Sequence, residues 1–514
     1  MALRTGRVII AKNIKLDKSY KDVLDYTESE MLTLVTTNKV DEVSSASFVK
    51  VGENQIDTPF SYADALKCNY MAFQNPSHAN KWFFCFIDHA EYINNGTTRI
   101  HFIVDVYSTW NDYWQVNNCF VIREHVSNDT VGANTVPESL ELGEYKILSR
   151  FKDSNMWPLK LVIASTLDPS DDSITSIGGT YGGIYSGVRY FTYDDSNMTN
   201  GIQNMVDDKK GDAISCVFLA PNFVLPQTGG GSVTDSNQPQ FYTNTIDPIT
   251  ALDGYVPKNN KLLTWPFCYI LASNSTGMAT TYRQEFFELV NNKIVFTVYG
   301  CLTPGCSIRM LPNNYNGYHL NLDAGITLGK FPQCNWATDM FTNWATQQGV
   351  NVGIQAATAV KDLGVGLATD NPALVIKGGI TAAQAVNQVY QASLIPPQTR
   401  GNINSGDITT SMGENTFSIY RMSIREEYAR ICDDYFTKYG YKINRIKTPS
   451  FNSRTYWNFI QIGADENIGY STLSNKSVPA SDMEIINNIF RQGVTIWHNH
   501  ANLGNYSLNN TIVS

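Results

Sequence analysis

Two histidines near the end of the chain form the most chemically suggestive pair in the sequence. His498 and His500 are separated by one residue, so an extended strand would carry both side chains on one side, where they could contribute to a metal site. No cluster of carboxylates or cysteines stands beside them in the sequence. A polar C-terminal stretch is therefore the favoured interpretation, and we predict no bound metal.

Paired carboxylates are the next candidates for chemistry, because hydrolases often use two of them on one substrate. Asp433-Asp434 and Glu426-Glu427 fall in a segment with helical periodicity, residues 424–438. Adjacent residues on a helix point about 100° apart, so neither pair converges on one atom. The sequence gives no reason to expect catalysis from them.

Known catalytic and nucleotide-binding motifs are absent from the sequence. It contains no H-E-x-x-H, Walker A loop, G-x-S-x-G or EF-hand loop, and the glycines at 178–183 lack the spacing and the following lysine of a phosphate loop. The nine cysteines are irregularly spaced without a C-x-x-C, and Cys301 and Cys306 have no second pair to complete a zinc site. We predict a non-enzyme without cofactor, with reduced thiols, folded in a cytoplasm.

The elements that would position these residues are mostly short strands. Residues 81–106 predict a β-hairpin around Asn95-Gly96, a pair suited to the positive φ angles of a tight turn. Further strands are predicted at 160–164, 214–219, 264–271 and 293–299, and helices at 338–348, 424–438 and 483–491. The fold class is therefore mainly β with a few helices (α+β), built from several barrel or sandwich domains.

Composition limits the function classes. The chain has 514 residues, of which 43% are hydrophobic and only 17% charged, and its formal net charge is −9. Such a chain can bury large cores, and its acidic balance argues against a surface that grips nucleic acid by neutralising phosphates. The apolar run at 8–11 is too short for a signal peptide, and no run reaches the length of an ordinary membrane span.

One segment, residues 350–397, differs from the rest. It is rich in Ala, Gly and aliphatic residues, its only aromatic residue is Tyr390, and residues 378–399 carry no charge. Polar residues at helical spacing, Thr381, Gln384, Gln388 and Gln391, suggest a weakly amphipathic helix with a wide apolar face. Composition leaves three interpretations open: a buried helical hairpin, a low-complexity linker, or a segment that is covered in one state and enters a bilayer in another.

Several strings, found in one order between about 83 and 499, resemble tail knob (distal tail tube) proteins of small short-tailed bacteriophages of the Picovirinae type. The longest is residues 252–267, Leu-Asp-Gly-Tyr-Val-Pro-Lys-Asn-Asn-Lys-Leu-Leu-Thr-Trp-Pro-Phe. The others lie at 122–126, 129–132, 137–138, 183–187, 331–336 with Asp339 and Trp344, 434–436, 439–441, Arg454, 457–458 and 493–499.

The resemblance implies a virion protein at the tail tip, a homohexamer with tube-forming β-barrel domains. It also implies hydrophobic loops that plug the lumen and then penetrate the host cytoplasmic membrane to form a channel. The matching position is 341–412, between an N-terminal barrel (1–150), middle knob domains (151–340) and a C-terminal return to the body (413–514). The residues expected to penetrate are Val352, Ile354, Val360, Leu363, Val365, Leu367, Leu374, Val375, Ile376, Ile380, Val386, Val389, Tyr390, Leu394 and Ile395.

The implied partners are further copies of the chain, the lower collar and tail-tip components, and viral DNA that passes through without sequence-specific binding. An acidic lumen would repel phosphates, and Asp105 is one residue that we predict to face it. Two other functions stay open at this point: a tail enzyme that degrades the cell wall, and a receptor-binding tail spike. The enzyme would need a converging acid–base or metal set, and the spike usually shows internal repeats.

Overall fold

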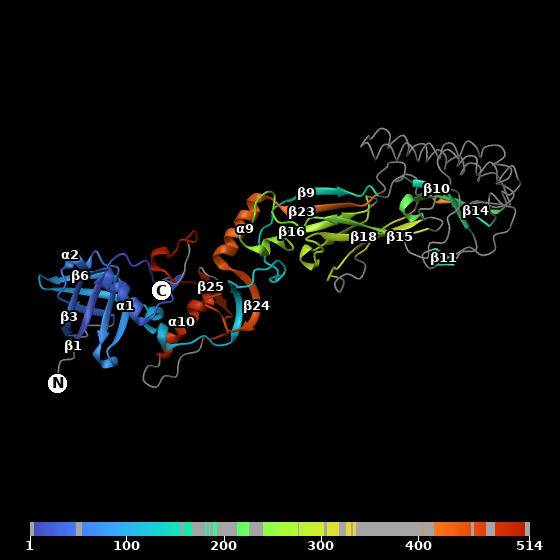
Figure 1. Ribbon diagram of the computed structural model, residues 1–514. Helices are drawn as coiled ribbons and strands as arrows, with labels where there is room; N and C mark the ends of the chain where they lie inside the picture. The colour runs from blue at the N-terminus through green and yellow to red at the C-terminus, as the bar shows by residue number, and fades with distance from the viewer. Residues whose placement is uncertain are drawn as a thin grey trace. The chain divides into compact units, whose positions relative to one another are not determined.

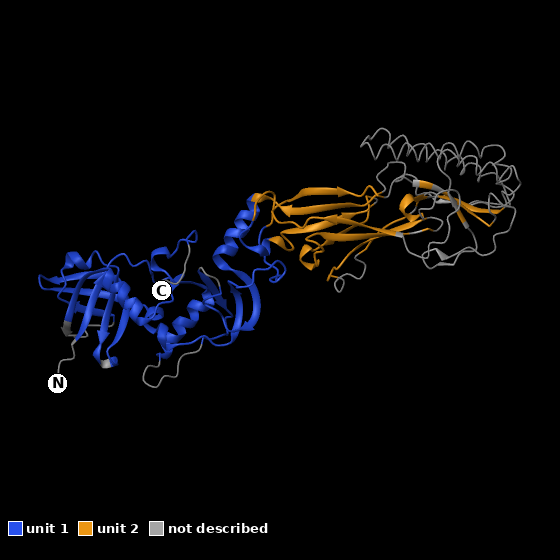
Figure 2. Cartoon of the chain, in the orientation of Figure 1, with its two compact units in different colours: residues 1–141, 257–262, 427–514 blue, residues 142–256, 263–426 orange. Residues whose placement is uncertain are grey.

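A computed structural model (Figure 1) describes residues 5–47, 54–155, 159–166, 180–181, 184–185, 189–192, 213–225, 240–275, 277–302, 306–317, 325–329, 331, 333–335, 403–404, 416–453, 457–468 and 478–508. Strands outnumber helices throughout these residues, so the predicted mainly β fold class is confirmed. The chain divides into two units, each assembled from distant segments (Figure 2). Unit 1 comprises residues 1–141, 257–262 and 427–514, and unit 2 comprises residues 142–256 and 263–426.

Unit 1 begins with an antiparallel six-stranded sheet. Its strand order is β3 (Lys39–Ser47), β1 (Thr5–Ala11), β5 (Tyr70–Asn75), β6 (Lys81–Asn94), β7 (Thr97–Val104) and β4 (Gln55–Thr58). Both faces are covered, because side chains of β1 alternate between two cores: Ile9 and Ala11 enter one, Val8 and Ile10 the other. Around the sheet lie α1 (Glu28–Thr37), α2 (Tyr62–Ala65), η1 (Pro76–His78), α3 (Val106–Trp110) and η2 (Asn111–Tyr113).

Helix α1 shows how local sequence and packing agree in this sheet domain. Thr27 accepts from the backbone N–H of Glu30, and the Glu30 side chain accepts from the backbone N–H of Thr27, a capping box that fixes where the helix begins. Met31 and Val35, four residues apart on one face, are fully buried in the first core. Trp497, from the far end of the chain, is buried in the same core.

A second sheet of unit 1 combines strands from both ends of the chain. Its order is β2 (Asp22–Leu24), β26 (Val494–Trp497), β25 (Asn458–Ile462), β8 (Cys119–Glu124) and β24 (Tyr441–Lys447). The β2–β26 pairing is parallel and the others are antiparallel. Two helices, α9 (Glu426–Tyr439) and α10 (Ala480–Gln492), end at Gly440 and Gly493, which have positive φ angles, and η8 (His500–Asn502) follows β26.

Unit 2 is built from antiparallel sheets. One has the order β17 (Ala279–Tyr282), β16 (Cys268–Ser273), β23 (Ser418–Ile424) and β9 (Tyr145–Lys152), and a second β15 (Gln240–Ile246), β18 (Ile294–Cys301), β19 (Ser307–Pro312) and β20 (Ile326–Leu328). A third has the order β13 (Arg189–Thr192), β10 (Leu159–Ser165), β14 (Ile214–Pro221), β21 (Gln333–Asn335) and β22 (Ile403–Asn404). Shorter elements of unit 2 are β11 (Thr180–Tyr181), β12 (Ile184–Tyr185), η4 (Asn222–Val224) and η6 (Gln284–Phe286). η5 (Asn260–Leu263) begins in the segment 257–262 of unit 1.

Most of the predicted elements that can be compared are confirmed. The hairpin is β6–β7, the helices at 424–438 and 483–491 are α9 and α10, and three predicted strands are β10, β14 and β18. The strand predicted at 264–271 begins only at Cys268, because residues 264–267 form a turn in which Phe267 N and Cys268 N donate to Thr264 O. The hairpin turn forms without a positive φ angle at Asn95 or Gly96, beside a register shift at Tyr92–Asn94. The helix predicted at 338–348 lies outside the described residues.

Candidate functional site

The predicted membrane-penetrating residues, Val352 to Ile395, lie outside the residues that the structure describes. The structure does describe the backbone on either side of that segment. β21 pairs antiparallel with β22, with Gln333 opposite Asn404 and Cys334 opposite Ile403. β21 also pairs with β14, so both strands belong to one five-stranded sheet, with β22 at its edge. The segment between them therefore leaves and returns at neighbouring positions of the same sheet.

The family-like strings of the sequence meet in a buried polar cluster of unit 1. We define this polar hub as Arg123, Asp129, Glu138, Asn259, Lys261, Asp433, Gly440 and Tyr441. They come from β8, the segment after it, the segment 257–262, α9 and the start of β24.

The ionic part of the polar hub centres on Glu138. One carboxylate oxygen accepts from Lys261 Nζ at 2.6 Å and from the backbone N–H of Lys442 at 2.8 Å, and the other accepts from Arg123 Nη2. The side chains of Arg123, Glu138 and Lys261 are only 8%, 3% and 2% exposed. Burial lowers the pKa of the Lys261 ammonium, while the hydrogen bond and charge of Glu138 oppose that shift.

The second part of the polar hub anchors the segment 257–262 to α9. Asp433 accepts from the backbone N–H groups of Lys258 and Asn259, at 2.8 and 3.0 Å, and from Asn259 Nδ2 at 2.8 Å. Tyr441 donates its hydroxyl to Asp129, which also accepts from Asn260 N. Asp433 was not expected to act in hydrolysis. In the structure its carboxylate has a structural role, because it accepts hydrogen bonds from the backbone of Lys258 and Asn259.

Gly440 and His125 lie where the polar hub packs against the end of β8. Gly440 has φ +61°, and a Cβ at this position would lie 2.3 Å from the backbone oxygen of Glu124, so only glycine fits without a shift. Buried His125 accepts from Phe459 N through Nδ1 at 2.7 Å, and its Nε2 therefore donates to Thr437 O at 3.1 Å. Every one of these groups is held by hydrogen bonds within the fold, which is typical of a structural site.

Glu124 and Lys447 form a related ion pair beside the polar hub. Lys447 Nζ bonds to one carboxylate oxygen of Glu124, and the other oxygen is buried without a hydrogen-bond partner among the described residues. Burial raises the pKa of the Glu124 carboxyl, and Lys447 opposes the shift. Sequence reasoning did not single out Glu124, Glu138 or Lys261 as a set; the available signal was charged residues inside strings that resemble one family.

The two C-terminal histidines do not come together as metal ligands. His498 is buried and contacts Phe451 O at 3.2 Å and Asp25 at 3.6 Å, whereas His500 Nε2 accepts from Lys15 N at 3.1 Å. No group of three or more potential ligands that could hold a metal occurs within the described ranges. Seven cysteines of these ranges, Cys68, Cys85, Cys119, Cys216, Cys268, Cys306 and Cys432, are buried free thiols.

The prediction that Asp105 faces a lumen is wrong. Asp105 is 1% exposed and caps α3: it accepts from Ser108 N at 3.2 Å, Ser108 Oγ at 2.7 Å and Tyr70 Oη at 2.6 Å. Its place within the alternating pattern of residues 100–106 suggested an outward direction, but β7 ends at Val104 and the chain turns into α3 at Asp105. Burial raises the pKa of this carboxyl, and the group lies inside the fold rather than at its surface.

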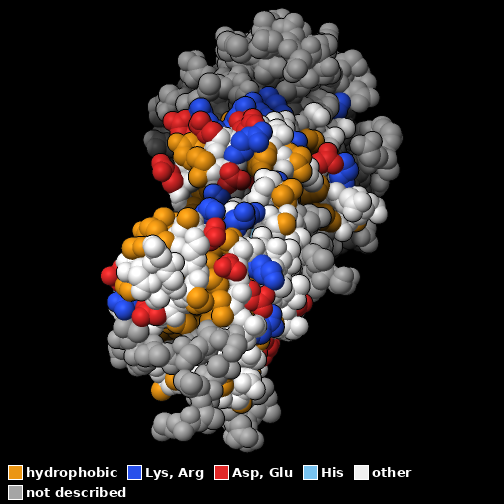
Figure 3. Space-filling view, turned by 90° about the vertical axis from the view of Figure 1, so that its left-hand side faces the viewer, with side chains coloured by type: hydrophobic (Ala, Val, Ile, Leu, Met, Phe, Trp, Pro, Cys, Tyr) orange, Lys and Arg blue, Asp and Glu red, His pale blue; other side chains and the backbone are white. Residues whose placement is uncertain are grey.

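The described surface mixes apolar and charged side chains. Figure 3 shows orange hydrophobic patches with acidic and basic side chains interspersed around them. Exposed large hydrophobic residues of unit 1 include Leu66, Tyr92, Ile103, Ile431 and Ile446. Among the helices that the structure describes, none is long and apolar enough to cross a membrane.

The chain is similar to proteins of phage tails along nearly its whole length. A family model described as the C-terminal domain of the tail knob protein gp9 of Bacillus phage phi29 matches residues 233–511, and one described as the N-terminus of the caudoviral major tail protein matches residues 4–115. The tail knob proteins gp9 of Bacillus phages PZA and phi29 are 25% and 24% identical, over 98% of both chains in each case. The solved structure of the bacteriophage C1 tail knob protein gp12 shares the fold, with a TM-score of 0.63 at 13% identity, over 99% of this chain and 100% of that chain.

Proposed function

The chain belongs to the tail knob protein family of short-tailed bacteriophages, and from this we propose that it forms the distal tail tube as a homohexamer whose hydrophobic loops, within 341–412, plug the lumen and later penetrate the host membrane. Membership places it in the tail of the virion as a structural protein rather than an enzyme. Assembly with other tail proteins and with itself follows from that place, and we propose the lower collar and tail-tip components as its neighbours.

The pairing of β21 with β22 is the observation that carries the proposal about the loop. A segment that leaves and returns at adjacent positions of one sheet can move as a unit without unfolding that sheet. The paired strands β21 and β22 would then stay in the sheet while the loop between them changes position. Such an arrangement suits a loop that fills a channel in one state and projects from it in another.

The composition of this loop is compatible both with burial against other copies of the chain and with contact with lipid. Residues 378–399 have no charge, and residues 350–377 mix Ala and Gly with Val, Ile and Leu. Small residues allow close helix packing in lipid, and the wide apolar face would be buried against other copies before release. Residues Val352 to Ile395 of the predicted set are the ones that we propose to contact lipid.

We further propose that DNA passes through the hexamer without specific contacts. The net charge of −9 favours repulsion over binding, since binding would require Lys and Arg side chains to replace counterions on the phosphates. With Asp105 buried, other carboxylates would have to provide the acidic lining. A basic lumen in a structure of the assembled ring would contradict this part of the proposal.

Dye release from phospholipid vesicles tests the loop. Replacing residues 341–398 by a flexible linker keeps β21 and β22 in place and should abolish release, and the pair Val386→Asp and Val389→Asp should reduce it strongly because charge opposes insertion. Ile446→Asp, at a side chain 72% exposed outside the loop, is the matched control and should release dye like the wild type.

Equal release by the wild type and the loop replacement would refute membrane penetration. Images of the purified protein test the assembly separately, because a sixfold ring with a central channel is expected. A trimer would instead favour the receptor-binding spike, and release of fragments from purified cell wall would favour an enzyme.

A further inference from the structure

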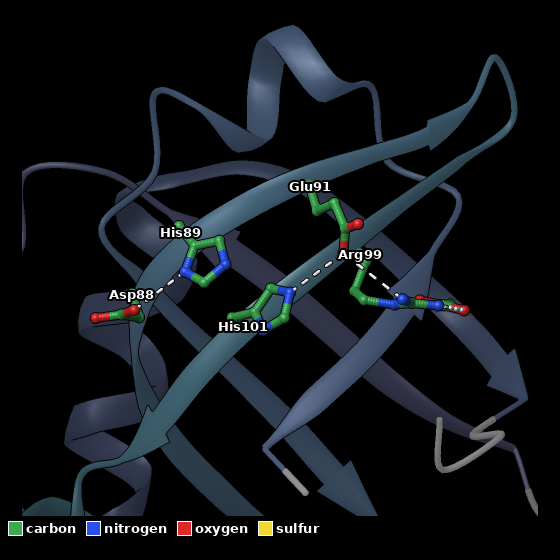
Figure 4. Close-up of polar contacts among 6 residues, drawn as sticks. Asp88, His89, Glu91, Arg99 and His101 are labelled. Atoms are coloured by element: carbon green, nitrogen blue, oxygen red, sulfur yellow. Dashed lines mark hydrogen bonds and ion pairs between the residues drawn. The ribbon is translucent and has the colours of Figure 1, made fainter. Parts of the chain in front are cut away.

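A pair of stacked histidine rings lies on the long hairpin of β6 and β7 (Figure 4). His89 and His101 are direct cross-strand neighbours, with ring centroids 3.9 Å apart and an interplanar angle of 13°. A register shift between Ile87 and His89 makes Asp88 the extra residue of a bulge. Without it, His89 would stand opposite Ile100, on the other face of the sheet. The bulge therefore creates the pair.

Each histidine has its own carboxylate, as the dashed lines in Figure 4 show. His89 Nδ1 lies 3.0 Å from Asp88 Oδ2, and His101 Nε2 lies 3.4 Å from Glu91 Oε2. These contacts orient both rings with one nitrogen toward a carboxylate oxygen.

Permanent cations approach the same carboxylates from neighbouring elements. Arg99 Nη1 of β7 lies 3.6 Å from Glu91, and the same guanidinium bonds Asp57 of β4 through Nε and Nη2 at 2.8 and 3.2 Å. Lys18, in the segment before β2, lies 3.5 Å from Asp88. Opposite His101 on β4 stands uncharged Gln55.

These groups give the hairpin face a charge that depends on the two imidazoles. Three carboxylates and two permanent cations surround the pair, so the cluster carries −1 when both rings are neutral and +1 when both are protonated. An ordinary imidazole changes charge near pH 6.5, within the range between neutral and mildly acidic surroundings.

The two protonations must influence each other because the rings are in contact. One imidazolium stacked on a neutral ring is favourable, whereas two imidazoliums at 3.9 Å repel. His89 has the freer side chain, 58% exposed against 20% for His101. Binding of the second proton is therefore opposed by the positive charge of the first. His89, the more exposed of the two side chains, is the ring that can move toward solvent.

We propose that His89 and His101 form a proton-sensing pair, in which the second protonation separates the rings and reverses the sign of charge on this face of the N-terminal sheet. A charged group next to this face would then face a net negative cluster at neutral pH and a net positive cluster at acidic pH. This inference concerns the sheet domain of unit 1 and does not depend on the membrane loop.

Exchange of the imidazole C2 proton for deuterium, followed by mass spectrometry of the full-length protein, tests the proposal. Trypsin cleaves after Arg99, so the two histidines fall in different peptides. In His89→Gln and in His101→Gln, the remaining histidine no longer faces a second imidazolium. The histidine that takes the second proton in the wild type should therefore titrate at higher pH in the variant that lacks its neighbour. Glu91→Gln should lower the titration midpoint of His101.

Titration midpoints that stay unchanged for both histidines in both glutamine variants would overturn the proposal. His78→Gln is the matched control: this histidine contacts Phe83 and Trp110 beside the same sheet, away from the pair, and its loss should leave both profiles unchanged. Amide exchange of peptides from β1 and β5 checks that each variant keeps the folded sheet.

Discussion

Glu138→Gln should destabilise unit 1 far more than the loss of one surface ion pair. The substitution keeps the size of the side chain but removes the one negative charge that pairs with both Arg123 and Lys261, whose side chains are almost completely buried. Removing one partner of a buried ion pair usually costs about 3–5 kcal/mol, because the remaining charge is left without compensation. We expect a loss of that size in the free energy of unfolding.

The order of the variants is a stricter test than the size of one effect. Lys261→Met should cost less, about 1–3 kcal/mol, since Glu138 keeps its contacts with Arg123 and the Lys442 amide. Glu484→Gln is the control: its ion pair with Arg491, at 2.8 Å, also lies in unit 1, its own side chain is 58% exposed, and the pair should be worth less than about 1 kcal/mol.

Amide hydrogen exchange in increasing urea is the suitable assay, because the chain has two units and one global transition would combine them. Peptides from 427–453 report on the part of unit 1 that contains the polar hub. If Glu138→Gln lowers their stability by less than about 1 kcal/mol, or if Lys261→Met is the more harmful change, the reasoning about the polar hub is wrong.

Three further predictions follow from single contacts. Gly440→Ala should cost more than about 2 kcal/mol, since the added Cβ meets Glu124 O at a positive φ angle; an unchanged urea midpoint would contradict this. His500 must be neutral to accept from Lys15 N, and burial together with Lys15 lowers its pKa, so its contribution is present above pH of about 6.5 and is lost as pH falls below that. The protection of the Lys15 amide against hydrogen exchange, measured relative to its intrinsic rate at each pH, should therefore fall on acidification in the wild type but not in His500→Gln. An equal fall in both proteins would refute this prediction. Ile403→Cys should form a disulfide with Cys334 under mild oxidation, because paired positions of antiparallel strands have Cα atoms about 4.5–5.5 Å apart; failure to cross-link, with Asn404→Cys as the offset control, would contradict the β21–β22 register.

Local patterns predicted the elements whose stabilising contacts are near in sequence. The alternation around Asn95-Gly96 identified the β6–β7 hairpin, and one apolar face followed by Gly440 identified α9. The same reasoning misplaced Asp105, because alternation cannot show that the strand stops and a helix begins at that residue. It also could not detect the Asp88 bulge, which decides the face on which His89 lies.

The sequence by itself determined the mainly β class, the uncharged aliphatic segment at 350–397 and the family resemblance, since all three depend on composition, periodicity and ordered strings. Only the tertiary structure decided that Glu138 pairs with both Arg123 and Lys261, that Asp433 holds the backbone at 258–259, and that β22 returns beside β21. These contacts join residues from 15 to 175 positions apart. No local periodicity encodes such pairings, because burial and charge compensation depend on which segments the whole fold brings together.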